Sequence, residues 1–374
     1  MNSKWNGAEQ ASANRHYLYV GGWAGAKGSA AGIQAFAYNT HIHSLSYIDT
    51  FGAYKSMSNV AVNGDLLFTC VESKDDDLIL TYRIQTDGSL VPLDSARAEG
   101  FGIADLTLDP KGRYLFTCNF KSCSLSMLRY DADGKLTLTD RYQVTDPGSY
   151  EIGFSSTERQ NSAYTHCAHV MPDGEHLCLC DMGSDKLYIF ALDRINGKLI
   201  PCPELTVTID GGEGARHIIF SADGRLAYMN TEMGNTVYVF SVGMDSSLTR
   251  LQKVSTLEPG VENPPKGWCS VTAMSPDGRY LYTGNRGQNN VAGFKIGEDG
   301  LLSGIGFFDC YGDSPRCLTF GFNGEVLFCS CNISGTLSVI ACDKETGRLG
   351  ECIQRINSVP GAAGIAWCAA GAGV

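Results

Sequence analysis

A strand–turn–strand unit recurs six times along the chain and is the feature that most restricts its fold. Each copy places a glycine turn between two runs of alternating apolar residues, which is the sequence signal of a β-hairpin. The turn glycines are Gly64, Gly112, Gly174, Gly224, Gly278 and Gly324, separated by 48, 62, 50, 54 and 46 residues. A third apolar run and usually a weaker fourth follow each hairpin. Four strands at a period of about 45–60 residues are typical of a β-propeller blade.

A seventh unit is divided between the two ends of the sequence. Residues 17–49 supply three strand-like runs, and GAAGIAWCA (361–369) supplies the missing first strand. Joining strands from both ends closes the ring and removes exposed sheet edges. We therefore predict an all-β fold with one domain over residues 16–374, a seven-bladed β-propeller of four-stranded antiparallel blades. The polar residues 1–15 are expected to form a flexible N-terminal extension.

The turn glycines also predict which side chains meet. Residues equally far before and after a hairpin turn lie at the same end of the hairpin. Counting eight residues back gives Ser56, Ala104, His166, Arg216, Ser270 and Arg316, and counting eight forward gives Glu72, Phe120, Met182, Glu232, Arg286 and Asn332. The first strand of each blade lines the central channel of a propeller. We therefore expect these positions to converge around the axis on one face of the ring.

Most of the positions in this set are polar, which indicates a functional pocket rather than solvated strand ends. The catalytic candidates are His166, Arg216, Glu232 and Arg286, and the substrate-binding candidates are Arg316, Ser270, Asn332 and His217. Strand alternation turns His217 away from its neighbour Arg216, so packing is favoured for it over a direct role. His169 is expected in the core or behind the site. Glu72, which precedes the SKDDD segment, is expected to be exposed to solvent.

Composition restricts the partners and the compartment. A net charge of −11 and a pI near 5.1 argue against nucleic acid or an anionic membrane as the main partner. No stretch approaches the roughly 20 apolar residues of a membrane span, and MNSKWNGAEQASANR lacks the apolar core of a signal peptide. The fifteen cysteines lie largely in strand-like runs without zinc-site spacing, which favours buried free thiols. We expect a cytoplasmic monomer that needs no metal or other cofactor.

Four segments of this sequence carry a family likeness: THCAHVMPDG, GARHIIFSADGRLAYMNTE, YLYTGNRG and DSPRCLTFGFNG. Together, over roughly residues 16–370, they resemble the lactonase family of seven-bladed propellers. That family includes 6-phosphogluconolactonases and fungal carboxy-muconate lactonizing enzymes. The resemblance implies an active site of His166, Arg216, Glu232 and Arg286, and it extends to ERQ (158–160) in the long connection 143–162. The chain departs from the family pattern at Tyr164, Ala215 and Thr231.

The resemblance and the arginines together point to metal-independent hydrolysis of an anionic sugar lactone. The first candidate substrate is 6-phosphogluconolactone, which would place the protein in the pentose phosphate pathway of carbohydrate metabolism. Glu232 or His166 would act as general base, Arg216 or Arg286 would stabilise the oxyanion, and Arg316 would clamp the phosphate or carboxylate. A carboxy-muconate cycloisomerase would use the same residues. A non-catalytic binding scaffold is a further alternative, although it would predict an apolar rim. The sequence leaves open which lactone or muconate is used and which residue is the base.

Overall fold

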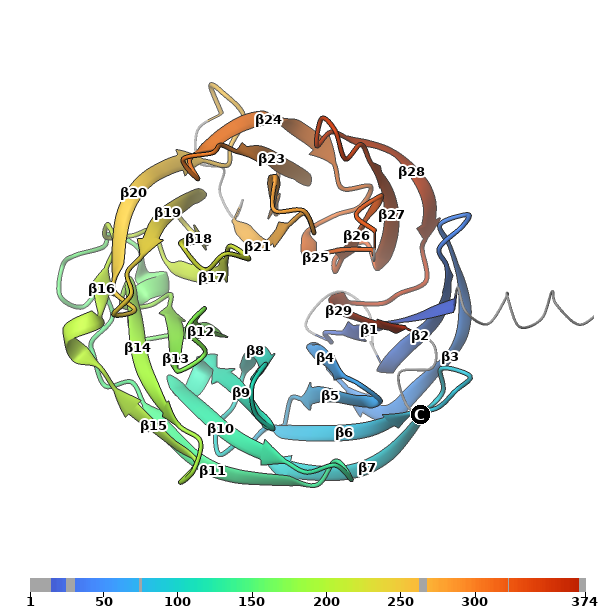
Figure 1. Ribbon diagram of the computed structural model, residues 1–374, viewed down its shortest axis with the longest axis horizontal. Coiled ribbons are helices and arrows are strands. Elements are labelled where there is room, and N and C mark those ends of the chain that lie inside the picture. Colours follow the sequence, from blue (N-terminus) through green and yellow to red (C-terminus); the bar gives the residue numbers. More distant parts are fainter. Residues whose placement is uncertain (1–14, 25–30, 74–75, 262–267, 322, 370–374) are drawn as a thin grey trace, which may run out of the picture.

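A computed structural model of the chain describes residues 15–24, 31–73, 76–261, 268–321 and 323–369. The described residues form seven β-sheets arranged as blades around a central axis (Figure 1). The extension expected over residues 1–15 lies, except for its last residue, outside the described part. The ring confirms the predicted seven-bladed propeller.

Six blades are each built from strands that follow one another in the chain, from the axis outwards. They are β4 (Val60–Asn63), β5 (Leu66–Val71), β6 (Leu78–Ile84) and β7 (Leu90–Arg97); β8 (Ile103–Leu108), β9 (Tyr114–Asn119), β10 (Ser124–Tyr130) and β11 (Leu136–Gln143); β12 (Thr165–Val170), β13 (His176–Asp181), β14 (Lys186–Asp193) and β15 (Lys198–Pro201) with β16 (Val207–Thr208); β17 (Ala215–Phe220), β18 (Leu226–Thr231), β19 (Thr236–Val242) and β20 (Leu248–Ser255); β21 (Cys269–Met274), β22 (Tyr280–Asn285), β23 (Asn290–Ile296) and β24 (Leu302–Asp309); and β25 (Pro315–Phe320), β26 (Val326–Cys331), β27 (Thr336–Cys342) and β28 (Leu349–Ile356). Three short 3₁₀ turns are described: η1 (Phe120–Ser122), η2 (Glu158–Gln160) and η3 (Pro203–Leu205).

The seventh blade closes the ring with strands from both ends of the chain. Its order is β29 (Ala362–Ala369), β1 (Arg15–Gly22), β2 (Ala31–Asn39) and β3 (Ser44–Lys55). β29 runs antiparallel to β1, with Leu18 opposite Trp367. In Figure 1 this dark red strand lies on the axis beside the dark blue strand β1. The C-terminal segment is therefore the inner strand of this blade, as the sequence predicted.

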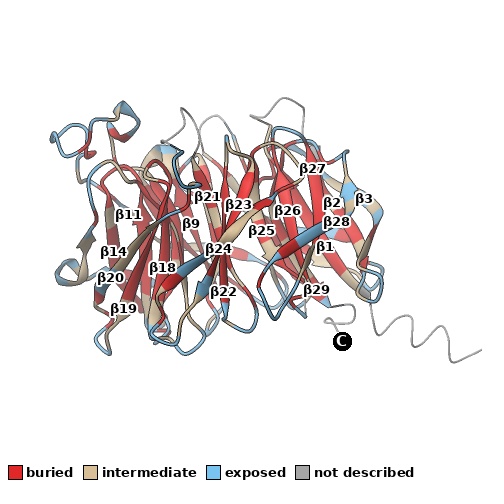
Figure 2. Cartoon of the chain, turned by 90° about the horizontal axis from the view of Figure 1, so that it is seen from above, coloured by how far each residue is buried: buried red, intermediate tan, exposed pale blue. Residues whose placement is uncertain are grey.

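The blades pack face to face, and this decides which strands are apolar throughout. All six residues of β5, β9, β22 and β26 are buried, because neighbouring blades cover both faces of these strands. Outer strands such as β28 are largely exposed along one face (Figure 2). Between two blades, Phe116 and Met127 pack with Leu179 and Phe190 in one apolar cluster. Such burial stabilises by about 25 cal/mol per Å² of apolar surface.

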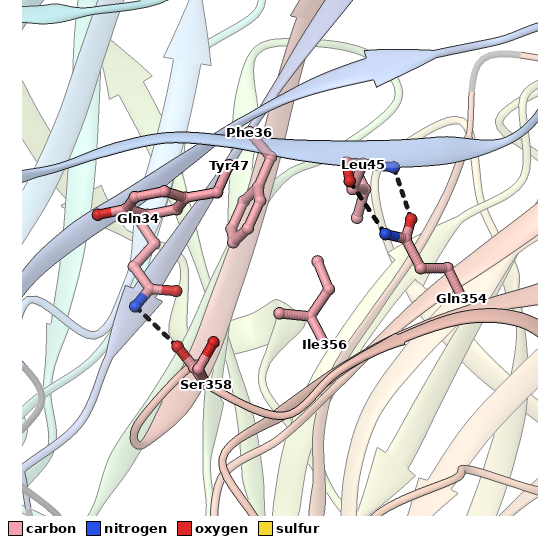
Figure 3. A pocket seen from close by; sticks show the side chains of 7 residues that line it. All are labelled: Gln34, Phe36, Leu45, Tyr47, Gln354, Ile356 and Ser358. Carbon is pink, nitrogen blue, oxygen red and sulfur yellow. Dashed lines mark hydrogen bonds between the residues drawn. The ribbon is translucent and has the colours of Figure 1, made fainter.

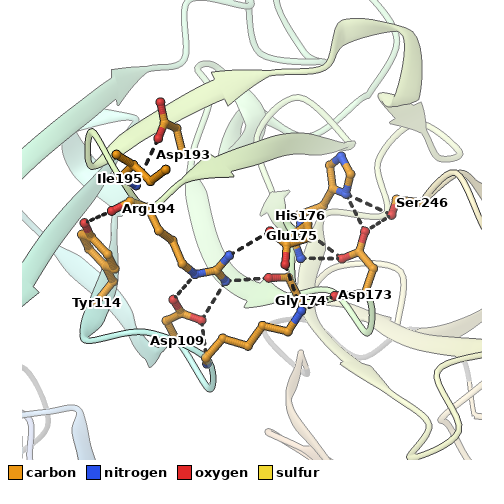
Figure 4. Close-up of polar contacts among 11 residues, drawn as sticks. Asp109, Tyr114, Asp173, Gly174, Glu175, His176, Asp193, Arg194, Ile195 and Ser246 are labelled. Carbon is orange, nitrogen blue, oxygen red and sulfur yellow. Dashed lines mark hydrogen bonds and ion pairs between the residues drawn. The ribbon is translucent and has the colours of Figure 1, made fainter.

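Polar contacts also tie neighbouring blades together at their hairpin turns (Figure 4). The guanidinium of Arg194 binds the buried carboxylate of Asp109 through two N–H···O bonds of 2.6 and 2.9 Å. Lys111 adds an ion pair with Glu175, at 2.9 Å between Nζ and Oε1. Because Asp109 and Lys111 follow β8 while Glu175 and Arg194 belong to the next blade, these contacts fix one blade against the other.

All fifteen cysteines are free thiols, and ten of them are buried. This confirms that they act mainly as small apolar residues in the strands. None of the described helices has the length and apolar character that a membrane span requires.

Candidate active site

β-Bulges in the inner strands position the side chains of the site. The register shifts across Ala104 in β8, His166 in β12, Arg216 in β17 and Arg316 in β25, so each of these residues is skipped in the ladder. A bulge bends its strand and re-aims the unpaired side chain, and bulges are common beside active sites. Counting from the turn glycines thus selects the bulged residue in four blades.

The second strand of each hairpin delivers its residue to the same end. The amide nitrogen immediately after the strand donates to a carbonyl just before the first strand. These bonds are Glu232 N to Gly214 O at 2.8 Å, Arg286 N to Trp268 O at 3.0 Å and Asn332 N to Ser314 O at 3.1 Å. The repeat therefore holds Glu232, Arg286 and Asn332 at equivalent positions in three consecutive blades.

These side chains surround a cavity of about 800 Å³ on the propeller axis. Its wall includes His166, Arg216, Glu232, Arg286, Arg316 and Asn332, together with Arg159, Trp23 and Trp268. In Figure 1 the inner strands β8, β12, β17, β21 and β25 enclose this central region. Residues more than 100 positions apart in the sequence therefore share one pocket.

Glu232 is the centre of the charge network. Its side chain is 2% exposed and contacts three guanidinium groups. Oε1 accepts from Nε and Nη2 of Arg159, at 3.1 and 2.5 Å. Oε2 accepts from Nε of Arg216 at 2.7 Å and lies 2.9 Å from Nη2 of Arg286. The imidazole Nε2 of His166 lies 3.9 Å from the same Oε2. Both carboxylate oxygens are thus occupied by arginine donors.

Main-chain carbonyls fix two of these arginines further. Arg216 donates through Nη1 to the carbonyl oxygen of Ser270. Arg286 donates through Nε to Trp268 O at 3.1 Å and through Nη2 to Cys269 O at 3.0 Å. Among the described residues, Nη2 of Arg216 and Nη1 of Arg286 have no hydrogen-bond partner. Each arginine is therefore held in place while one of its amino groups is free to bind a ligand.

Arg159 reaches the site from the long connection between two blades rather than from a strand. It is the middle residue of η2, and the Thr157 side chain caps the turn by accepting from the Arg159 amide. Its guanidinium stacks on the Trp268 ring at 4.2 Å from the ring centroid. At 38% exposure its side chain is the most open of the groups that bind Glu232. Arg159 therefore covers the Glu232 cluster at the mouth of the cavity.

Arg316 lies in the same cavity without a counter-ion. Within the described part of the chain, no carboxylate pairs with it and no hydrogen bond engages its guanidinium, which stacks on the Trp23 ring at 5.6 Å from the centroid. The Trp23 indole in turn donates to Glu72 Oε1 at 2.8 Å. A cation that is held in a pocket without an anion favours binding of an anionic ligand.

The charges and the burial set the protonation states of the site. Burial raises the pKa of Glu232, but the charges of Arg286, Arg216 and Arg159 outweigh it and hold that pKa well below its usual range. Burial, and then the charge of Arg216, lowers the pKa of His166 well below 6.5. Burial, and then Arg216 and Arg286, lowers the pKa of Arg316 to about 9. At neutral pH Glu232 is therefore ionised and His166 is a neutral imidazole.

Three expectations about single residues need correction. Ser270 does not line the cavity: it is fully buried, and its hydroxyl donates to Gly284 O, while its carbonyl holds Arg216. His217 does line the cavity, because the bulge at Arg216 breaks the alternation that would have turned it away. Glu72 is a partly buried wall residue bound by Trp23 instead of a solvent-exposed one.

Counting from the turn glycines missed three groups that the structure adds to the site, Arg159, Trp268 and Trp23, although the family resemblance had included the ERQ segment that contains Arg159. None lies at a position that the turn glycines select. The available signal was loop length, because both long connections, 143–162 and 257–268, deliver a residue to the cavity. Residues 262–267 of the second connection lie outside the described part.

A second cavity of about 450 Å³ lies at the outer edge between β2–β3 and β28, away from the axis (Figure 3). Gln354 closes one end by accepting from Leu45 N at 2.6 Å and donating to Leu45 O at 3.0 Å. Its lining includes Phe36, Tyr47 and Ile356 but no acid, base or arginine. This cavity is a joint between blades rather than a reaction site.

One other cluster resembles a catalytic triad in composition only. Asp173, His176 and Ser246 meet at the turn face (Figure 4), but both partners contact the same imidazole nitrogen. Nδ1 of His176 lies 2.6 Å from Asp173 Oδ2 and 3.2 Å from Ser246 Oγ. A triad needs the acid and the nucleophile on opposite ring nitrogens. Among the described residues, no group of three or more His, Cys, Asp or Glu is placed to hold a metal ion.

A closed propeller whose axial cavity holds a cluster of buried ionisable side chains is the arrangement expected of a propeller enzyme. Comparison with known proteins gives the family: the model of the seven-bladed β-propeller lactonases matches residues 17–367. The chain belongs to this family of lactonases, enzymes that hydrolyse cyclic esters.

Individual relatives agree with this assignment. A 6-phosphogluconolactonase of Bacillus subtilis is 27% identical over 336 residues, which cover 88% of this chain and 92% of the relative. A 6-phosphogluconolactonase of Serratia proteamaculans is 26% identical over 306 residues, covering 82% and 86%. The solved structure of a putative 6-phosphogluconolactonase from Bacteroides fragilis superposes with a TM-score of 0.84 at 23% identity, covering 98% of this chain and 100% of the other. That likeness supports the fold.

The connection that carries Arg159 offers a test of the site's geometry. Gly183 packs against it so closely that an added Cβ would overlap the Ser162 carbonyl oxygen. We expect Gly183→Ala to push the connection outwards and to lower the free energy of unfolding by about 1–3 kcal/mol, as overpacking does. Lactone hydrolysis should fall with it because Arg159 moves. Gly304→Ala is the matched control, since an added Cβ there meets no atom within 4 Å. Equal urea midpoints and equal activity for the two variants would contradict this account.

Proposed function

We propose that the protein hydrolyses 6-phosphogluconolactone, an anionic sugar lactone. The observation that carries the proposal is the buried cluster of Glu232 with three arginines beside Arg316, which has no counter-ion among the described residues. One carboxylate neutralises only part of this positive charge, so the cavity favours an anionic ligand. The names of the relatives from Bacillus subtilis and Serratia proteamaculans supply the particular lactone.

The arginines divide into two roles by their existing contacts. Arg316 binds the phosphate group of the substrate, because it is the guanidinium with no anion of its own. Arg216 and Arg286 are fixed by Glu232 and by main-chain carbonyls, and each keeps one free amino group. Donors fixed before the reaction stabilise a developing oxyanion without reorganisation. The carbonyl oxygen of the lactone therefore lies against Arg216 and Arg286.

His166 is the general base of the proposed reaction, and Glu232 organises the arginines. Both oxygens of Glu232 already accept hydrogen bonds from arginines, so neither is open to take a proton from water. The His166 imidazole is neutral, and no hydrogen bond from another described residue occupies it. A neutral imidazole in a pocket can take a proton from water, a role worth about 10²–10⁴-fold in rate.

The chemical steps balance with these groups alone. His166 takes a proton from water while the hydroxide oxygen bonds to the lactone carbonyl carbon. Arg216 and Arg286 stabilise the oxyanion of the tetrahedral intermediate. When the intermediate collapses, the bond from that carbon to the ring oxygen breaks, and the protonated His166 returns its proton to the leaving oxygen. The product is the open-chain acid, and His166 is neutral again.

The test is a substrate panel with the purified protein. We expect loss of 6-phosphogluconolactone to be accelerated above its spontaneous rate, and glucono-lactone, which lacks the phosphate, to react with a kcat/KM lower by at least about tenfold. Carboxy-muconates run in parallel distinguish a cycloisomerase. Arg316→Met should remove the preference for the phosphorylated lactone. No acceleration of 6-phosphogluconolactone, or turnover of carboxy-muconates alone, would refute the proposal.

The pH dependence of the reaction tests whether the base has the lowered pKa of His166. A histidine whose folded pKa is lowered stays neutral from pH 7 down to well below 6.5, and its activity as a base is lost only as the pH falls through that lowered value. We therefore expect kcat/KM to be flat from pH 7.5 through 6.5 and to fall only at clearly lower pH. Initial rates in buffers of constant ionic strength measure this, with spontaneous hydrolysis subtracted. A decline centred near 6.5 would show an ordinary histidine and contradict the assignment.

A further inference from the structure

The axial cavity has a second layer beneath the arginines. The residues that follow the bulged positions along the inner strands form it: Asp105 after Ala104, His217 after Arg216 and Cys317 after Arg316. All three line the same cavity as the arginines. Asn59, Val271 and Ile365 also line the cavity. Asp105 and His217 are therefore the acid and the imidazole of this layer, which we call the floor.

Neither of these two side chains is used by the proposed reaction or engaged by the protein's own charges. Asp105 has no ion pair within the described part of the chain; Thr107 Oγ1 donates to it at 3.3 Å, and the Cys167 thiol and the main-chain amides of Leu106 and Ala168 partly offset the effect of its burial. The ring of His217 has no hydrogen-bond partner there, and its Nδ1 is buried. A buried polar atom without a partner is unfavourable by about 1–3 kcal/mol. Both groups therefore have hydrogen-bonding capacity left for a ligand.

The chemistry of the floor differs from that of the arginine layer. Burial raises the pKa of Asp105, which shifts its carboxyl group towards the neutral form that donates as well as accepts. Burial, and then the charge of Arg216, lowers the pKa of His217 to about 3, so its imidazole is neutral with one donor and one acceptor. A floor without a cation but with donors and acceptors suits hydroxyl groups, and an acid there disfavours a second carboxylate on the ligand.

We propose that Asp105 and His217 form a hydroxyl-binding subsite at the floor of the axial cavity, which selects lactones with one anionic end and a polyhydroxylated ring. This inference rests on the proposed function and deepens it. The arginine layer (Arg216, Arg286 and Arg316) binds the phosphate and the reacting carbonyl, while the floor forms hydrogen bonds with the ring hydroxyls. A dicarboxylate such as a muconate brings a second anion and no such hydroxyls, and so the floor discriminates against it.

The experiment measures binding rather than turnover, by calorimetry with two ligands. Inorganic phosphate reports the arginine layer, and glucose 6-phosphate adds a hydroxylated ring without a bond to hydrolyse. We expect the wild-type protein to bind glucose 6-phosphate at least about tenfold more tightly than phosphate. Asp105→Leu should abolish that preference while phosphate affinity stays within about twofold. Asp105→Asn, which retains a donor and an acceptor, should preserve most of it.

His217→Phe gives the same test from another blade, and its result stands on its own if Asp105→Leu fails to fold. A wild-type protein without the preference, or variants that keep it, would overturn the inference. So would an equal loss of affinity for both ligands. The proposed function is judged separately by turnover: hydrolysis of 6-phosphogluconolactone without hydroxyl-dependent binding refutes only the subsite. Hydroxyl-dependent binding without hydrolysis refutes only the proposed function.

Discussion

The carboxylate of Glu232 inside a group of arginines is the interaction on which the site depends. A carboxylate and several guanidinium groups are costly to bury separately, and they are tolerated here because each neutralises the other within hydrogen-bonding distance. The partners come from three parts of the chain: the strands around Arg216, the next blade with Arg286, and the long connection with Arg159. Forming the cluster therefore requires the ring to be assembled, and it fixes these segments against one another.

The same cluster explains how a symmetric fold acquires an asymmetric site. The inner strands β8, β12, β17, β21 and β25 each carry a bulge, but only some of them place an ionisable side chain there. His166, Arg216 and Arg316 occupy bulged positions, whereas the equivalent residue of another blade is Ala104. Glu232 binds the arginines on one side of the axis and leaves Arg316 without a counter-ion. The proposed anion-binding and proton-transfer roles follow from that imbalance.

The sequence predicted the fold and much of the site, because turn glycines and strand lengths are local signals that the repeat multiplies. Counting eight residues before and eight after Gly224 correctly placed Arg216 and Glu232 at one end of a hairpin. The prediction failed where a β-bulge changes the alternation of side chains along a strand: His217 lines the cavity, and Ser270 does not. Residue counting did not select Arg159, which entered only through the family likeness of ERQ, since the path of a long connection depends on tertiary contacts such as the stacking on Trp268 and the close approach at Gly183.

Glu232→Gln tests the central claim, that Glu232 holds the arginines together and that this cluster supports lactone hydrolysis. The amide keeps the shape but removes the charge, so three guanidinium groups lose their shared counter-ion. The account predicts a free energy of unfolding lower by about 3–5 kcal/mol together with loss of 6-phosphogluconolactone hydrolysis, when urea unfolding and turnover are measured on the same preparation. Glu72→Gln, a wall residue outside the cluster, should be much less affected. Wild-type stability and activity within about tenfold of wild type for Glu232→Gln would contradict the account.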